Sequence, residues 1–165
     1  MLESGHLGGK CADLSALFVG LCRAAGIPAR DVYGLRVAPS GKGLRSLGLT
    51  SDDATRAQHC RAEVYLTGDG WVPVDPADVR KAVLEEPPGN LAVSDARVRT
   101  ARERLFGSWE MNWIAYNFAQ DVSLRGSSRG PLGFFMYPEG ETANGAIDSL
   151  DPEHFKYSIV AREVM

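Results

Sequence analysis

The sequence predicts an α+β domain in which a buried N-terminal helix packs on an antiparallel β-sheet. Two observations predict this class: an apolar stripe of helical spacing close to the N-terminus, and later segments that alternate like strands and are joined by turns. The length of 165 residues predicts a single domain over residues 1–165. A hydrophobic fraction of 44% and a charged fraction of 24% are typical of a globular chain.

The helix is predicted over residues 11–25. Only Asp13 and Arg23 are charged in this span, so we expect the helix to be buried on most sides. Gly26 is a typical residue just beyond a helix end, and Pro28 prevents continuation. The apolar positions that recur at spacings of three and four are Leu14, Leu17, Phe18, Leu21, Cys22 and Ala25.

A strand over residues 29–37 and a hairpin are predicted next. The hairpin joins strands at 59–66 and 71–75 through a turn at 67–70, which contains Gly, Asp and Gly. Residues 38–56 are rich in Gly, Ser, Asp and Thr and are predicted to form a long surface loop. Loops of this length are uncommon without a function, so we expect this one to border a cleft or to bind a ligand.

The second half of the chain predicts two more helices and three more strands. A short helix is expected at 77–84 before the breaker Glu85-Glu86-Pro87-Pro88-Gly89, and a second at 94–106 with Ser94 as its N-cap. Strands are predicted at 111–118, 132–137 and 155–161, and a loop at 121–130.

The charge balance excludes several classes of partner. The chain has 18 basic and 21 acidic residues, a net charge of −3 and a pI near 5.6, so it lacks the basic surface of a nucleic-acid-binding protein. Its longest apolar stretch, 14–21, is much shorter than the roughly 20 residues that a membrane span needs. We therefore expect neither nucleic acid nor membrane as a partner.

The cysteine content excludes a disulfide scaffold. Three cysteines are an odd number, so at least one thiol is free or pairs between molecules. No Cys or Cys/His spacing typical of zinc occurs, so we expect no metal and no cofactor. The compartment stays open: free thiols are typical of the cytoplasm, and an exported parent protein is the alternative.

Cys11 is a candidate nucleophile because it stands in the first turn of the predicted helix, after Gly8, Gly9 and Lys10. A helix N-terminus presents free N–H groups and a partial positive charge, which favour thiolate over thiol. The same N–H groups can stabilise an oxyanion. The alternative interpretation is a small apolar core residue, and position alone favours neither.

His59 and Asp75 are the candidate base and orienting acid. With the turn near Gly68, Asp75 falls opposite Arg61 or Ala62, and the Arg61 register puts it on the same sheet face as His59. An acid behind the imidazole would fix its tautomer and stabilise the imidazolium. The alternatives are a structural histidine and an aspartate that forms a turn.

The other cysteines and histidines fit structural roles. Cys22 lies further along the same helix and is predicted to be a core residue. Cys60 follows His59 in a strand and is expected to point to the opposite sheet face. His6 and His154 have no partner in the pattern and are predicted to lie on the surface.

Three sequence blocks resemble the transglutaminase-like superfamily of papain-type cysteine enzymes. Residues 9–14 (GKCADL) through 23–30 (RAAGIPAR) are similar to its nucleophile block. His59 with Glu63-Val64-Tyr65 resembles its histidine block, and 70–76 (GWVPVDP) resembles its aspartate block. The order Cys, His, Asp also matches. The blocks cover roughly residues 8–80, and a less specific resemblance to bacterial members extends from 112 to 161.

The resemblance implies a papain-like core and a catalytic triad of Cys11, His59 and Asp75. Such enzymes cleave amide bonds through a thioester acyl-enzyme, either as hydrolases and cysteine proteases or as acyl transferases, and act on amides of peptides or proteins. The alternative is an inactive member that serves as a binding or scaffold module. Relatives carry helices before the nucleophile, whereas ten residues precede it here, so we expect an N-terminally truncated fragment of a longer protein. Arg61 stands where many relatives have an aromatic residue of the cleft wall.

Overall fold

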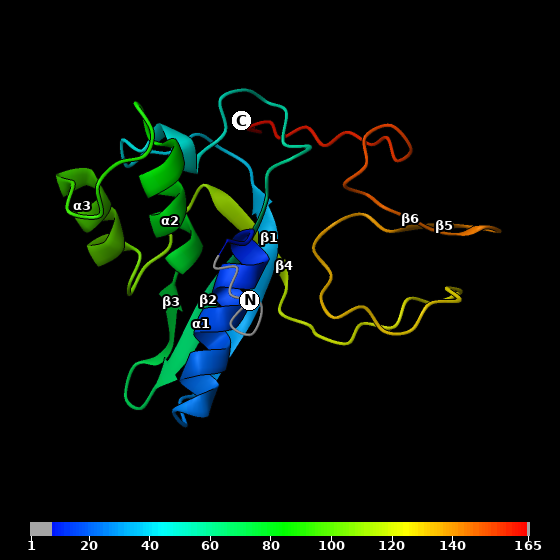
Figure 1. Cartoon of the computed structure of the whole chain (residues 1–165), viewed down its shortest axis with the longest axis horizontal. Helices are drawn as coiled ribbons and strands as arrows, with labels where there is room; N and C mark the ends of the chain where they lie inside the picture. The colour runs from blue at the N-terminus through cyan, green and yellow to red at the C-terminus, as the bar shows by residue number, and fades with distance from the viewer. Residues whose placement is uncertain (1–7, 165) are drawn as a thin grey trace.

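The fold is a helix packed on a four-stranded antiparallel sheet, as Figure 1 shows for the computed structural model, which describes residues 8–164. The strands lie in the order β3 (Gly70–Val74), β2 (Gln58–Leu66), β1 (Ala29–Arg36) and β4 (Trp113–Asn117). The helix α1 (Cys11–Ala24) contacts the two central strands, β2 and β1. The predicted α+β class is confirmed. The single domain over 1–165 stays a prediction.

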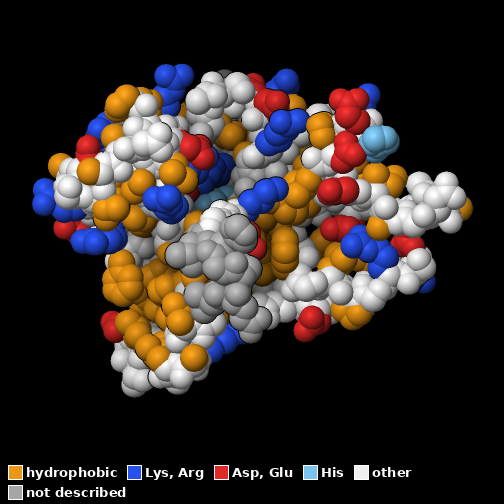
Figure 2. Space-filling model, viewed as in Figure 1, with side chains coloured by type: hydrophobic (Ala, Val, Ile, Leu, Met, Phe, Trp, Pro, Cys, Tyr) orange, Lys and Arg blue, Asp and Glu red, His pale blue; other side chains and the backbone are white. Residues whose placement is uncertain are grey.

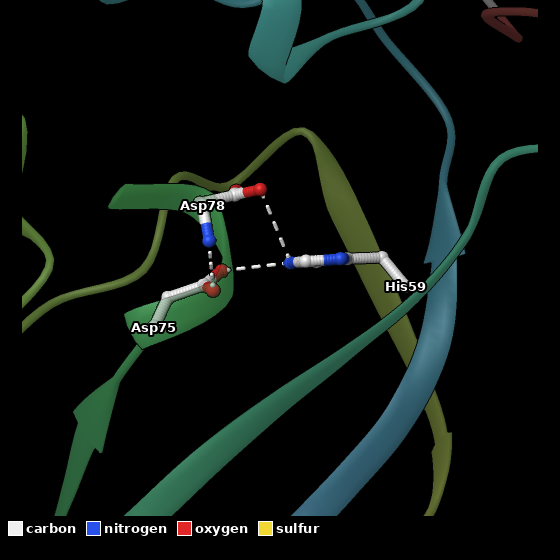
Figure 3. Close-up of side chains that lie close together, drawn as sticks. All are labelled: His59, Asp75 and Asp78. Carbon is white, nitrogen blue, oxygen red and sulfur yellow. Dashed lines mark hydrogen bonds and ion pairs between the residues drawn. The ribbon is translucent and has the colours of Figure 1, made fainter. Parts of the chain in front are cut away.

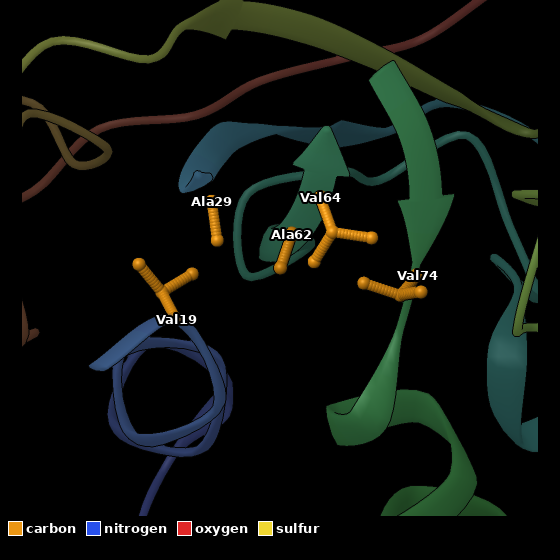
Figure 4. Packing of buried hydrophobic residues seen from close by; sticks show 5 residues of the cluster. All are labelled: Val19, Ala29, Ala62, Val64 and Val74. Carbon is orange, nitrogen blue, oxygen red and sulfur yellow. The ribbon is translucent and has the colours of Figure 1, made fainter. Parts of the chain in front are cut away.

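The main apolar core lies between α1 and the sheet. Val19 of α1 points at the sheet, as Figure 4 shows, and is 2% exposed. Its buried neighbours in the cluster are Ala29, Ala62, Val64 and Val74. The buried face of α1 is narrower than expected: Ser15 and Val19 are buried, whereas Leu21 is 58% exposed. The sheet is only wide enough to cover one side of the helix, so the apolar stripe extends onto the surface.

The predicted hairpin has the register that the turn requires. Strand β2 pairs with β3 through Leu66 with Gly70 and Ala62 with Val74, which puts Asp75 one residue further, level with Arg61. Gly26 after α1 has φ +79°, a left-handed conformation that favours glycine, as expected beyond a helix end.

Two further helices lie together at one end of the sheet (Figure 1): α2 (Pro76–Glu85) and α3 (Ala96–Arg104). The predicted N-cap Ser94 is wrong, because the side chain of Asp95 accepts a hydrogen bond from the backbone N–H of Arg97 and so caps α3. The long segment 38–56 contains a short 3₁₀ helix, η1 (Arg45–Leu47), and its Leu44 and Leu47 pack in a cluster with α2 and α3.

The predicted strands at 132–137 and 155–161 are wrong. Within them only Leu132 and Val160 form isolated bridges, to Val122 and Asp53. The apolar run at 132–137 serves side-chain packing instead, because Phe134 stacks on Tyr33 of β1. A small hairpin, β5 (Gly140–Thr142) and β6 (Gly145–Ile147), lies in a part of the chain that extends away from the sheet (Figure 1).

Within residues 8–164, no helix combines the length and the apolar character that a membrane crossing requires.

Candidate functional site

Cys11 is the first residue of α1 and is half-buried. The N-terminus of α1 is fixed by the carboxylate of Asp13, which accepts a hydrogen bond of 2.9 Å from the backbone N–H of Lys10. From β2, the backbone N–H of Cys60 donates to the Sγ of Cys11 at 3.5 Å. The helix start and the sheet therefore both direct N–H groups toward this sulfur.

The environment of Cys11 favours its thiolate. Burial raises the pKa of the thiol, but a hydrogen bond to His59, the charge of His59 and the N–H groups of Cys60 and Ala12 outweigh burial, so the pKa lies below its usual value. Cys60 is the opposite case. It is fully buried, and burial together with the charge of Asp31 raises the pKa of its thiol. Cys22, which is half-buried, also has a pKa raised by burial.

His59 lies in β2 with 4% of its surface exposed. Its Nε2 is 2.9 Å from Oδ2 of Asp75 and 3.3 Å from Oδ1 of Asp78, as Figure 3 shows. Because both carboxylates contact Nε2, the other ring nitrogen, Nδ1, is the one that can form the hydrogen bond with the sulfur of Cys11. The backbone carbonyl of His59 accepts a hydrogen bond from the indole of Trp113 at 3.1 Å, which ties this strand to β4.

The two carboxylates keep the imidazole protonated. Burial alone lowers the pKa of His59, and Arg36 does the same, but the charges of Asp75 and Asp78 and the hydrogen bond of Asp75 raise the pKa to about 9. His59 is therefore an imidazolium at neutral pH. With the lowered pKa of Cys11, this arrangement supports a thiolate–imidazolium pair.

Asp75 is placed by the local sequence. It is the N-cap of α2, where its Oδ1 accepts a hydrogen bond of 2.9 Å from the N–H of Asp78, and Pro76 suits the first helical position. Burial raises the pKa of Asp75, but the charge and hydrogen bond of His59 and the charge of Arg61 lower it below its usual value. Its carboxylate thus serves both the helix and the imidazole.

Asp78 was not among the predicted site residues. It is fully buried, and burial together with the charge of Asp75 raises its pKa. Its side chain forms an ion pair with both terminal nitrogens of Arg36, one of them 3.1 Å from Oδ2. The available signal was its spacing: a residue three positions after an N-cap lies on the same end of the helix, close to the cap.

Two buried arginines complete the site. Nε of Arg61 lies 3.0 Å from Oδ2 of Asp75, and Nη1 of Arg61 donates to the backbone carbonyl of Glu110 at 2.7 Å. The guanidinium lies over the ring of Trp113, 4.8 Å from its centroid. Arg36 donates to the carbonyl of Leu47 at 2.6 Å. Arg61 therefore lies behind the acid, although the aromatic residue of relatives at this position belongs to the cleft wall.

His59, Asp75 and Asp78 also offer three potential ligand atoms within 4.8 Å of one another. Each carboxylate is already paired with a guanidinium, Asp75 with Arg61 and Asp78 with Arg36. The arginines supply the positive charge that a divalent ion would bring, so these residues fit an ion-pair cluster better than a metal centre.

A cavity of about 490 Å³ is lined by residues of the segment 129–139, and none of Cys11, His59 and Asp75 lines it. Met136, one of its lining residues, packs with Tyr33 and Cys60, and Cys11 and Tyr137 pack against that cluster. The wall next to Cys11 is thus built by the irregular segment after β4. Figure 2 shows hydrophobic and charged side chains intermixed over this face of the molecule.

The side chains of the other cysteines and histidines of the chain lie outside the candidate site as far as the structure describes them. Cys60 is fully buried and Cys22 packs against the main core. His154 lies on the surface, but it does have a partner: its Nδ1 is 2.7 Å from Oδ2 of Asp151. His6 lies outside the described residues. The segment 38–56 supports the site through the carbonyl of Leu47, which accepts from Arg36.

Comparisons with known proteins relate the first part of the chain to a family. Residues 1–76 match the family model described as the transglutaminase-like superfamily. The chain is also 40% identical, over 173 aligned positions, to an uncharacterized protein of Haemophilus influenzae (strain ATCC 51907 / DSM 11121 / KW20 / Rd); the match covers 99% of this chain and 46% of that protein. The chain therefore spans less than half the length of this relative. No solved structure gives a significant match. Residues 1–76 therefore carry a transglutaminase-like superfamily core domain, and the helix on a four-stranded antiparallel sheet is consistent with such a core.

Proposed function

We propose that this chain is a cysteine-dependent amide-bond hydrolase or acyl transferase, with Cys11 as nucleophile, His59 as general acid and base, and Asp75 as the residue that orients the imidazole. The observation that carries the proposal is geometric: the Sγ of Cys11 lies 3.5 Å from the backbone N of Cys60, next to His59 in β2, and Nε2 of His59 lies 2.9 Å from Oδ2 of Asp75. The lowered pKa of Cys11 and the pKa of His59, raised to about 9, agree with this geometry. A thiolate beside an imidazolium is the reactive form of papain-type enzymes.

The chemistry follows from this pair. The thiolate of Cys11 attacks the carbonyl carbon of an amide, a C–S bond forms, and the carbonyl oxygen takes up the negative charge. N–H groups at the start of α1, such as that of Ala12, would stabilise this oxyanion. The C–N bond then breaks, and the imidazolium of His59 gives its proton to the leaving amine. A thioester between the acyl group and Cys11 remains.

Release of the acyl group reverses the proton movement. His59, now neutral, takes a proton from water or from a second amine, which attacks the thioester carbon. The C–S bond breaks and the thiolate of Cys11 is restored. Water gives hydrolysis and an amine gives transfer. The proposed substrates are side-chain or main-chain amides of peptides or proteins, which would lie along the wall formed by residues 129–139.

The thiolate can be tested directly with iodoacetamide. The protein is alkylated between pH 5 and pH 9, and the labelled residues are identified by mass spectrometry. Labelling of Cys11 is expected to stay fast below pH 7, whereas Cys22 and Cys60, whose pKa values are raised, should label slowly. Equal, slow labelling of all three cysteines would contradict a reactive thiolate at Cys11.

Turnover is tested by release of ammonia from glutaminyl peptides, with and without an added primary amine. Cys11→Ala is the control. Ammonia release that disappears in Cys11→Ala supports the proposal. Retention of the peptide by both proteins without ammonia release would instead support the alternative, a binding or scaffold module that has lost catalysis.

A further inference from the structure

Asp78 is a buried acid that the proposed mechanism does not use. Its carboxylate is fully buried and lies 3.3 Å from Nε2 of His59, against 2.9 Å for Asp75. Figure 3 shows the two carboxylates converging on the same ring nitrogen, one from the N-cap of α2 and the other from the third residue of that helix. One N–H donor thus faces two acceptors.

Each acid has a different arginine as its nearest cation, and Arg61 also approaches Asp78, with 3.8 Å between Nη2 and Oδ2. Arg61, from β2, pairs with Asp75, and Arg36, from β1, pairs with Asp78 through both terminal nitrogens. A guanidinium that contacts both carboxylate oxygens fixes the plane of the carboxylate as well as its position. Asp78 therefore cannot rotate away from His59 without breaking its pairing with Arg36.

We propose that Asp78 is a second positioning residue for His59, so that the imidazole is oriented by two acids, each fixed by its own arginine. This assignment rests on the proposed function, in which His59 exchanges protons with the substrate. The charged and titratable groups that face His59 are Cys11 from α1, Arg36 from β1, Arg61 from β2, and Asp75 and Asp78 at the start of α2.

Two acids have a consequence that a single acid lacks. When the imidazolium donates its proton to the leaving amine, two like charges remain near Nε2, and the arginines balance them. Removal of either acid leaves the other within hydrogen-bonding reach of the ring. Loss of Asp78 should therefore lower the pKa of His59 only in part. Loss of Asp75 should also leave the pKa of His59 above its ordinary value.

The test is NMR titration of His59 in a Cys11→Ala background, where no thiolate is present. Asp78→Asn is expected to lower the pKa of His59 by about one unit, from about 9. The matched control is Asp95→Asn, which alters the exposed N-cap of α3 and should leave the pKa of His59 unchanged. An unchanged pKa of His59 in Asp78→Asn would overturn the assignment.

Asp75→Asn provides a second variant if Asp78→Asn does not fold. Asparagine is as good an N-cap as aspartate, so α2 keeps its start. With Asp78 still present, the pKa of His59 is expected to stay above its ordinary value of 6.5, because without an acid burial and Arg36 would lower it below that value. A fall to 6.5 or below in Asp75→Asn alone would show that Asp78 does not act on His59.

The kinetic readout uses the protein with Cys11 intact. A fall of one unit in the pKa of His59 moves the alkaline limb of the kcat profile down by about one pH unit. Asp78→Asn should therefore lower kcat about threefold at pH 8.5 and leave kcat at pH 6 nearly unchanged, because His59 with a pKa of about 8 is still protonated there. The KM should not change, because Asp78 is fully buried and does not contact substrate. A rise in KM with unchanged kcat would contradict the assignment.

Slow, pH-independent alkylation of Cys11 in the unaltered protein would overturn the proposed function, whereas the titration in Cys11→Ala decides the role of Asp78 separately.

Discussion

The guanidinium of Arg61 lies directly against the carboxylate of Asp75, with 3.0 Å between Nε and Oδ2, and both side chains have no exposed surface. They come from neighbouring strands of the hairpin, β2 and the end of β3. Since a buried charge is costly without its partner, this pair links the stability of the hairpin to the integrity of the site.

Arg61→Met is expected to destabilise the protein strongly. It leaves the buried carboxylate of Asp75 without its arginine and the carbonyl of Glu110 without its donor, a loss of about 3–5 kcal/mol in the free energy of unfolding. Chemical denaturation measures this loss. The control is Arg30→Met, which removes a partly exposed ion pair to Glu63 and should cost about 1 kcal/mol or less. Equal effects of the two substitutions would show that Arg61 is not buried against Asp75.

Two glycines are expected to respond in opposite ways to alanine. A Cβ at Gly34 would overlap the carbonyl oxygen of Ile114 and the indole of Trp113, so Gly34→Ala should cost at least about 2 kcal/mol of unfolding free energy. Gly20 lies within α1 with open space around it, so Gly20→Ala should stabilise by about 1 kcal/mol. Thermal and chemical unfolding of both variants check this. Stabilisation by Gly34→Ala would contradict the close approach of β4 to β1.

Stability should fall as pH rises through the titration of His59. The pKa of His59 is about 9 in the folded protein and 6.5 in an unfolded chain, so its contribution is complete below pH 6.5 and is lost as pH approaches 9. The lowered pKa of Cys11 acts in the opposite direction, so the measurement uses Cys11→Ala. Urea denaturation between pH 6 and pH 9 should show this loss, and Cys11→Ala with His59→Gln should flatten it. Identical slopes in the two proteins would mean that His59 is not an imidazolium.

Cys60 should react only when the protein unfolds. Its side chain is fully buried and the pKa of its thiol is raised by burial and by Asp31. In Cys11→Ala, alkylation of Cys60 by iodoacetamide is expected to increase with urea in parallel with global unfolding. Rapid labelling in native buffer would show that the sheet opens locally around Cys60.

The sequence predicts those parts of the site that depend on local patterns. Cys11 follows from a helix start, and the approach of Asp75 to His59 follows from a tight turn and the two-residue periodicity of a strand. The role of Arg36 could not be predicted from a local pattern, because Arg36 and Asp78 are 42 positions apart and their side chains meet only in the folded chain. The wrong strand prediction at 132–137 has the same origin, since the apolar side chains of this segment pack on a distant residue, Tyr33, and do not belong to a paired strand.

The hairpin register has a consequence beyond the placement of one acid. A slip of β3 by a single residue along β2 would turn Asp75 toward α1 and bring Val74 to the histidine, because neighbouring strand residues point to opposite faces. A misaligned chain would then hold an isolated imidazole and an unmatched guanidinium among apolar groups, at a large energetic penalty. The charges of His59, Asp75 and Arg61 therefore also disfavour hairpins with the wrong register. Reactivity of the Cys11 thiolate would then indicate that β2 and β3 are correctly aligned.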